Sequence, residues 1–300
     1  MLNIIKYFKF WLTISIVLVV LSLIALFAFG LKLGIDFKGG TMTQITFESQ
    51  APSISDVKST LSADGKNTDS VIQPIGTKSL IIRTGPIEND EHLRLMKLLS
   101  DKFGTFTEDQ YSSIGPVIGK ELKSKAIMQL ILVSLGIIFY IAYAFRKVSK
   151  PVSSWKFGVA AVIALLHDLL IVIGVFALLG KFISIEIDSL FVTALLTVLG
   201  FSVHDTIVVF DRIRENLRIR SGADLGEIIN SSINQTLIRS INTSLTVIFV
   251  LLALLLFGGE SIRYFVLALL IGITAGTYSS IFIASPILLV WHKWDLRRRG

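Results

Sequence analysis

The sequence predicts an all-α membrane bundle of six transmembrane helices that carries one small α+β domain of the ferredoxin-like type. Three observations support this fold class. Charged residues make up 17% of the 300-residue chain, whereas soluble domains contain about a quarter. Six runs that reach the roughly twenty residues needed to cross a bilayer contain either no charged residue or a single aspartate. Between the first two runs lies a stretch with the charge and periodicity of a folded, water-soluble domain.

The first apolar run lies between Lys9 and Lys32 and follows Lys6 and Lys9. A cleaved signal peptide also begins with basic residues, but its apolar core spans roughly 7–15 residues and ends at a small-residue cleavage site. This run is longer, and Ala28-Phe29-Gly30 matches such a site weakly. We therefore predict a retained transmembrane helix over residues 1–31.

Five further runs make up a predicted transmembrane domain over residues 123–300. They lie between Lys125 and Arg146, Lys156 and Lys181, Asp188 and Asp211, Arg239 and Glu260, and Arg263 and His292. All five are long enough to span a bilayer. The last is longer than a span requires and contains Pro286, so we expect it to tilt or kink.

Lys and Arg are distributed unequally between the two sides of these helices. One side carries Lys6, Lys9, Arg146, Lys147, Lys150, Lys156, Arg212, Arg214, Arg218, Arg220, Arg239, Lys293, Arg297, Arg298 and Arg299. The two short loops of the other side carry Lys181 and Arg263, and Lys123 and Lys125 precede the second helix there. The positive-inside rule therefore places both termini and the loop at about 211–239 in the cytoplasm, and residues 32–122 outside.

Residues 32–122 have the pattern of a small α+β domain. Thr43, Ile45 and Phe47 alternate with polar residues, as in a half-buried strand. Ser53 precedes a short helical pattern, and Asn89 precedes a second helix with Leu93, Met96, and Leu99 or Phe103 on one face. Apolar runs at 71–72 and 80–82 and a weaker run at 105–112 complete a β-α-β-β-α-β order, which is typical of a ferredoxin-like sandwich.

Four ionisable residues lie within the predicted spans. His167 and Asp168 fall near the middle of the third helix, and His204 and Asp205 fall in the fourth. Each such group costs at least about 2.5–3.5 kcal/mol inside a membrane and therefore requires a reason to be there. One interpretation is a proton relay, since a carboxylate and an imidazole exchange protons near neutral pH. The other is a polar clamp that only fixes helix packing.

Charges just beyond Asp205 allow a simpler interpretation. Asp211, Arg212, Arg214 and Glu215 fit a charged helix end at the membrane surface. Arg239 either flanks the fifth helix or reaches inward as a counter-ion, and its spacing favours the flanking role.

Gly272 and Gly276 form a small-xxx-small motif that predicts close helix packing, and Ser279 and Ser280 extend the same small surface.

Several function classes are not supported by the residues. The net charge of +7 arises outside residues 31–121, which hold ten Lys/Arg and twelve Asp/Glu, so topology explains it and no nucleic-acid partner is predicted. Without cysteine there is no thiolate metal site. Residues 115–120 resemble a P-loop but have three residues between the glycines instead of four. No enzyme, cofactor or metal site is predicted, and an ion gradient is the natural energy source.

Three segments resemble the SecD/SecF protein-export family of the resistance-nodulation-division superfamily. G-I-D-F-K-G-G-T at 34–41 resembles the D-F-x-G-G-T segment after the first helix of these proteins, and I-G-P-V-I-G at 114–119 resembles their V-G-P-x-x-G segment. His167-Asp168, I-E-I-D at 185–188 and the run at 200–216 are similar to the SecF branch, because SecD has V-D-A in place of H-D-T. The resemblance covers nearly the whole chain, at the length of a stand-alone SecF.

The resemblance implies a half-transporter of the inner membrane that pairs pseudo-symmetrically with SecD. Together the two would use the proton-motive force, or sodium in some relatives, to promote export of unfolded polypeptides through the SecYEG channel, with YajC and YidC as accessory subunits. The functional carboxylate of the family corresponds to Asp205, its interfacial run includes Asp211, Arg212 and Arg214, and an arginine before the fifth helix corresponds to Arg239. This revives the counter-ion role for Arg239.

Two features qualify this assignment. The family motif at Asp36, Phe37, Gly39, Gly40 and Thr41 is interpreted as structural, because two glycines permit a tight turn. The position before the aspartate is often Asn in the family but is His204 here, and this histidine either joins the relay or replaces the asparagine amide.

Two alternatives stay open: an ion-independent scaffold of the translocase, and half of a small-molecule exporter of the same superfamily.

Overall fold

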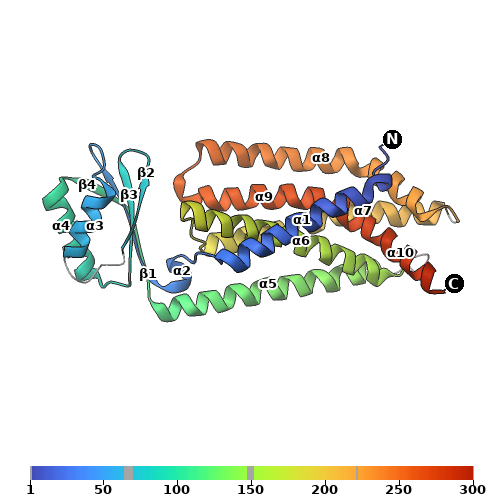
Figure 1. The fold of residues 1–300 in the computed structure, drawn as a ribbon, viewed down its shortest axis with the longest axis horizontal. Coiled ribbons are helices and arrows are strands. Elements are labelled where there is room, and N and C mark those ends of the chain that lie inside the picture. Colours follow the sequence, from blue (N-terminus) through green and yellow to red (C-terminus); the bar gives the residue numbers. More distant parts are fainter. Residues whose placement is uncertain (1, 64–69, 147–151, 221, 300) are drawn as a thin grey trace. The chain divides into compact units, whose positions relative to one another are not determined.

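The computed structural model describes residues 2–63, 70–146, 152–220 and 222–299. The chain forms two compact units, Met1–Lys32 with Met128–Gly300, and Leu33–Ile127 (Figure 1). Lys147 and Lys150, which enter the orientation argument, lie outside the described residues.

The first unit is helical and confirms the predicted all-α membrane bundle. Its elements are η1 (Ile5–Tyr7), α1 (Phe8–Phe29), most of α5 (Pro116–Ala144), α6 (Ser154–Ile183), α7 (Ser189–Ile219), α8 (Leu225–Phe257), η2 (Glu260–Ile262), α9 (Arg263–Ser279), the π-helix η3 (Ser280–Ala284) and α10 (Ser285–Arg299). Within the described residues, six segments are long and apolar enough to span a membrane. The sixth comprises η2, α9, η3 and most of α10, and Pro286 lies in the first turn of α10.

One segment differs from its expected form. Residues 211–239, predicted as a loop, are largely helical, because α7 continues to Ile219 and α8 begins at Leu225. The Asp224 side chain accepts a hydrogen bond from the Glu227 backbone amide and caps α8. Two long helices thus extend past their apolar runs before the chain turns.

Glycines allow the central helices to approach closely. A Cβ atom at Gly272 of α9 would lie 2.3 Å from a methyl carbon of Val198 on α7, and one at Gly276 would lie 3.0 Å from the Ser202 Cβ. The packing expected from the glycine motif is therefore present between α7 and α9. Around this contact α6, α7 and α9 pack against one another, α8 packs against α7 and α9, and α1 packs against α6.

The second unit has the predicted ferredoxin-like fold. After α2 (Ile35–Lys38), its elements are β1 (Gly40–Phe47), α3 (Ile54–Ala63), β2 (Val71–Ile75), β3 (Ser79–Thr84), α4 (Asn89–Phe103) and β4 (Phe106–Ile114). The antiparallel sheet has the order β2-β3-β1-β4, and Ile45 of β1 pairs with Leu80 of β3. Alternate β1 residues, including Ile45 and Phe47, are buried with Leu61 and Leu99 in one core.

The buried face of α4 was predicted incorrectly at one position. Leu93 is 59% exposed, whereas His92, Leu95 and Leu99 are buried. Neighbouring helical positions point about 100° apart, so a helix that buries His92 exposes Leu93. The imidazole of His92 lies 3.0 Å from a Glu108 carboxylate oxygen, and its ring centroid lies 4.0 Å from that of Tyr111. These contacts make a histidine suitable for this face.

Candidate intramembrane site

Asp168 is completely buried at the middle of α6. One carboxylate oxygen lies 2.9 Å from Nδ1 of His167, and the other accepts hydrogen bonds from the hydroxyls of Ser202 at 2.6 Å and Ser279 at 2.8 Å. Ser202 is on α7 and Ser279 ends α9. The carboxylate therefore joins three helices through polar contacts.

Asp205 lies on α7, one helical turn beyond Ser202, and is 7% exposed. Ser240 of α8 donates a hydrogen bond to Oδ1 at 2.5 Å, and Ser280 of η3 donates to Oδ2. One turn further along α8, the hydroxyl of Ser244 lies 2.6 Å from that of Thr277 on α9, so polar contacts between helices continue beyond Asp205. The second carboxylate thus also draws its donors from two other helices.

The π-helix η3 lies where the two carboxylate sites meet. It begins at Ser280, immediately after Ser279, and the Ser285 hydroxyl donates to the Ser280 carbonyl oxygen five residues earlier at 3.3 Å. Single π-turns within α-helices occur frequently at functional sites. Here the wider turn separates α9 from α10 at the depth of both carboxylates.

The donors around the two carboxylates are hydroxyls and one imidazole, and no Lys or Arg of the described chain is paired with either carboxylate. Ionisable side chains inside a membrane are rare and typically mark ion pathways or proton relays. In the described residues, His, Asp and Glu form no group of three that could hold a metal ion.

Two predicted members of the site are not brought to Asp205. His204 is exposed, because it points about 100° away from the buried side chain that follows it. Arg239 is also exposed, while the next residue, Ser240, faces Asp205. Among the described residues, no ion pair joins Arg239 to Asp205. A counter-ion role for Arg239 within this chain is therefore not seen.

The interfacial run forms local pairs along α7. Arg214 pairs with Asp211, and Arg212 Nη1 lies 2.8 Å from a Glu215 carboxylate oxygen. The next residue, Asn216, is buried and donates from its side-chain amide to Ser232 at 2.8 Å and to Gln235 at 3.1 Å on α8. Sequence reasoning missed Asn216. The sequence did contain a signal for it, because Ser232 and Gln235 of α8 are polar residues that can bond a side-chain amide at the end of α7.

The glycine motif is a packing device in the α+β unit. Gly39 has φ +79° and Gly40 has φ +144°, a backbone region that favours glycine. A Cβ at Gly39 would lie 2.8 Å from Cα of Pro116, and one at Gly119 would lie 2.8 Å from the Gly39 nitrogen. The adjacent Thr41 hydroxyl lies 3.0 Å from that of Ser113. The two sequence motifs at 34–41 and 114–119 are thus packed against each other.

The other two motif residues lie in α2. Phe37 is 6% exposed and belongs to the buried residues, and Asp36 lies in the first turn of the helix. Acidic residues are favourable in a first turn because of the helix dipole.

The fold and site together define a class: a six-span membrane protein with a ferredoxin-like domain after its first helix and two hydroxyl-bound carboxylates in the core of its helical bundle. Comparison with known families makes the assignment specific. The profile described as "Protein export membrane protein SecD/SecF, C-terminal" matches residues 95–294, and that of the "SecD/SecF GG Motif" matches residues 24–51. The chain belongs to the SecD/SecF family.

Individual relatives agree with this assignment. The chain is 48% identical to "Protein translocase subunit SecF" of Thermobaculum terrenum, over 99% of this chain and 96% of that protein, and 41% identical to the protein of the same name from Anaerolinea thermophila, over 99% and 96%. The crystal structure of SecDF, a translocon-associated membrane protein from Thermus thermophilus, is similar with a TM-score of 0.85 at 34% identity. The match covers 97% of this chain and 39% of that longer chain.

Proposed function

We propose that this protein is an auxiliary subunit of the Sec protein translocase that pairs with SecD and uses the proton-motive force to promote polypeptide export. The names of its full-length relatives support the translocase role. The match covers 39% of the similar SecDF chain, whose name joins SecD to SecF, and this supports SecD as the proposed partner. SecYEG, YajC and YidC are further proposed partners on family grounds.

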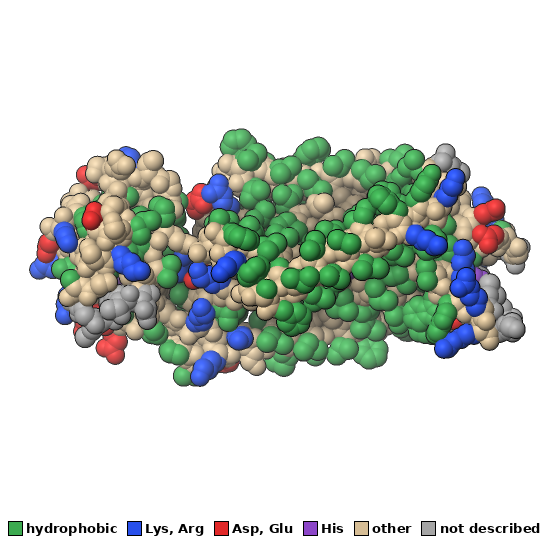
Figure 2. Space-filling view, viewed as in Figure 1, with side chains coloured by type: hydrophobic (Ala, Val, Ile, Leu, Met, Phe, Trp, Pro, Cys, Tyr) green, Lys and Arg blue, Asp and Glu red, His purple; other side chains and the backbone are tan. Residues whose placement is uncertain are grey.

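The proposed topology places both termini in the cytoplasm and the α+β unit outside the inner membrane. The end of the helical unit that carries both termini is rich in Lys and Arg (Figures 1 and 2). Members of this group include Lys6, Lys9, Arg212, Arg214 and Lys293. Basic residues of this kind are enriched in cytoplasmic segments beside transmembrane helices.

The proposed SecD contact uses polar residues that α7 and α8 expose at membrane depth. They include His204 on α7 and Arg239 and Asn242 on α8. Thr193, Thr197, Thr243 and Thr246 are also exposed, but their hydroxyls donate to backbone carbonyl oxygens of their own helices. Polar groups in contact with lipid are unfavourable, whereas helix–helix interfaces accommodate them through hydrogen bonds. A partner bundle covering α7 and α8 would meet this requirement and would bring new groups near Asp205.

The proposed coupling group is Asp205. One observation carries this role: its carboxylate is buried on α7, while both of its hydrogen-bond donors come from other helices, Ser240 from α8 and Ser280 from η3. Protonation from outside would weaken both contacts, and release of the proton inward would restore them. This change alters how the helices pack against SecD and biases the external domain between two orientations that pull or trap the emerging polypeptide.

The test is export of a secreted precursor in cells that carry Asp205→Asn, under intact and collapsed proton-motive force. Asn keeps the size and hydrogen bonding of Asp but does not titrate. We expect normal protein levels and normal SecD association, with export reduced to that of cells lacking the protein. Unchanged export would leave the carboxylate a packing group and favour the ion-independent scaffold. Export insensitive to the gradient in both strains would also reject ion coupling.

A further inference from the structure

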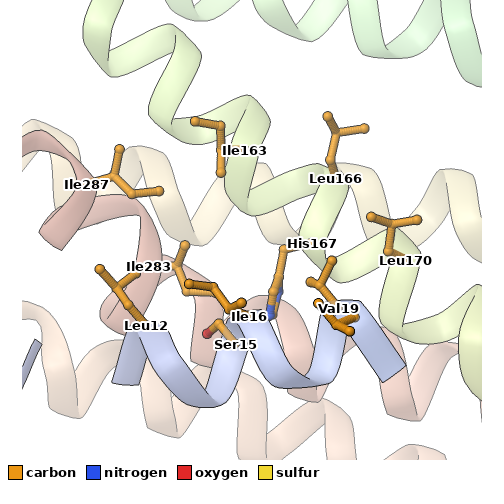
Figure 3. Close-up of a pocket in the computed structure, with 11 residues that line it drawn as sticks. Leu12, Ser15, Ile16, Val19, Ile163, Leu166, His167, Leu170, Ile283 and Ile287 are labelled. Carbon is orange, nitrogen blue, oxygen red and sulfur yellow. The ribbon is translucent and has the colours of Figure 1, made fainter. Parts of the chain in front are cut away.

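Hydroxyl residues occupy every fourth position along part of the buried face of α8. They are Ser232, Thr236, Ser240 and Ser244. All four are buried, with at most 5% of each residue exposed, and residues four apart lie on the same face of a helix. We call this row the hydroxyl ladder. The surface between α1, α6 and the η3–α10 segment differs, because all of its described lining residues except Ser15 and His167 are aliphatic (Figure 3).

Two residues of α7 hold the hydroxyl ladder in its present register. The Ser240 hydroxyl donates to Asp205 Oδ1 at 2.5 Å, and the side-chain amide of Asn216 donates to the Ser232 hydroxyl at 2.8 Å. Thr236 lies between these two contacts. Among the described residues, its hydroxyl donates to carbonyl oxygens of its own helix, at 3.1 and 3.2 Å, and to no group of α7. A buried hydroxyl of the ladder is therefore not used by the neighbouring helix.

The equal spacing of the hydroxyl ladder provides a second set of partners for α7. Consider a shift of α8 by four residues along its axis toward its own N-terminal end, which is about 6 Å at 1.5 Å per residue. Ser244 would then take the place of Ser240 beside Asp205. Thr236 would take the place of Ser232 beside the asparagine amide of α7. Both polar groups of α7 would again face a hydroxyl.

Two observations favour this direction of movement. The opposite shift would bring Ile228, which has no hydroxyl, to the Asn216 amide. It would also draw the exposed Arg239 away from the basic end of the helical unit, where a charged side chain is less costly than at the middle of a membrane (Figure 2). Thr277, which contacts the ladder at present, keeps the bond that its hydroxyl donates to a carbonyl oxygen of α9 at 2.9 Å.

We propose that Ser244 and Thr236 are positioning residues for a second register of α8, which the helix adopts when the charge on Asp205 is removed. A hydrogen bond to a charged carboxylate is roughly twice as strong as one between neutral groups. The charged Asp205 therefore holds Ser240, and the neutral one releases it. Movements of one turn past a neighbouring helix occur where two packed arrangements exist. This inference rests on the proposed function, since it describes the movement that follows a change of charge at Asp205.

The register can be measured between two nitroxide labels, because the chain contains no cysteine. Ile219→Cys at the end of α7 and Leu256→Cys near the far end of α8 replace residues that are 71% and 69% exposed. The full chain is reconstituted with a cysteine-free SecD, and double electron–electron resonance gives the distance. We expect one distance with Asp205 and, with Asp205→Asn, a second population about 5 Å shorter. Ile238→Cys with Leu256→Cys, both on α8, is the control pair and should give one unchanged distance.

Two variants of the hydroxyl ladder identify the second register. In the Asp205→Asn chain, Thr236→Val and Ser244→Ala should each lower the shorter-distance population at least fivefold, because a buried polar group loses its partner there. Thr274→Val is the matched control, since this exposed hydroxyl of α9 donates to its own helix at 2.7 Å, and it should leave both populations unchanged. If one ladder variant fails to fold, the other decides.

Two results would overturn the proposal. One is a single distance in the Asp205→Asn chain, and the other is a shorter distance that the ladder variants retain in full. Export separates this failure from that of the proposed function. If Asp205→Asn stops export while the label distance stays single, the ion-coupled translocase role stands and the change of register is wrong.

Discussion

Ser279 and Ser280 are adjacent in the sequence but donate to different carboxylates, Ser279 to Asp168 and Ser280 to Asp205. Neighbouring helical side chains diverge by about 100°, so this junction of α9 and η3 faces two helices at once. A change in the charge of one aspartate therefore acts on the backbone segment that also holds the other. The pair of serines is the shortest covalent link between the two sites.

Ser280→Ala tests this link directly. A hydrogen bond to a charged group contributes about 1.5–3 kcal/mol, so its loss should weaken the contact between Asp205 and η3 by about tenfold or more. We expect gradient-dependent export to fall by a similar factor while protein levels hold. The control is Ser134→Ala on α5, whose hydroxyl donates to the Leu130 carbonyl of its own helix. Equal export in the two variants would argue against the link.

Gly200→Leu tests the proposed SecD face. Gly200 is exposed on α7, and a Cβ there would meet nothing within 4 Å. We expect the thermal stability of the isolated chain to be unchanged and co-purification of SecD to fall at least tenfold, because a bulky side chain separates closely packed helices. Gly136→Leu on α5, an equally open position, is the matched control. Loss of SecD in both variants, or in neither, would place the contact elsewhere.

Gly272→Ala should weaken the bundle itself. The added methyl would lie 2.3 Å from a Val198 methyl carbon, so α7 and α9 must move apart. Overpacking of this kind costs about 1–3 kcal/mol, and we expect a lower melting temperature in detergent. Gly200→Ala on α7 should be neutral or slightly stabilising, since alanine has the higher helix propensity and no clash opposes it. The comparison is a thermal melt followed by size exclusion.

Gly39→Ala should destabilise the α+β unit by two effects. The residue would adopt φ +79°, and its Cβ would meet the Pro116 backbone at 2.8 Å. Gly76→Ala also requires a positive φ, of +60°, but its Cβ would meet open space, so it has a backbone cost without the clash. We expect limited proteolysis of the unit to be fastest in Gly39→Ala and intermediate in Gly76→Ala. Equal rates would mean that the contact between the two motifs adds no stability.

The sequence predicted the six spans, the ferredoxin-like order and the two buried aspartates, because each has a local signal. The length of an apolar run, the alternation of apolar and polar residues, and a charge within an apolar run can all be read directly from the sequence. The donors Ser240 and Ser280 have no such signal, because serine is tolerated almost anywhere in a transmembrane helix. The π-turn at η3 likewise has no recognisable sequence pattern, although Pro286 indicated an irregularity near it. Adjacency suggested that His204 joins Asp205, whereas helical geometry points the two side chains apart.

We propose that Asp205 takes up and releases a proton inside the membrane. Infrared difference spectroscopy of the chain reconstituted with SecD, recorded as the pH is lowered, measures this directly through the carbonyl stretch of a protonated carboxyl group. Asp168→Asn and Asp205→Asn separate the two sites. We predict a reversible carboxyl band that persists in Asp168→Asn and disappears in Asp205→Asn. An identical band in wild type and Asp205→Asn would show that another group takes up the proton and would overturn the proposed role of Asp205.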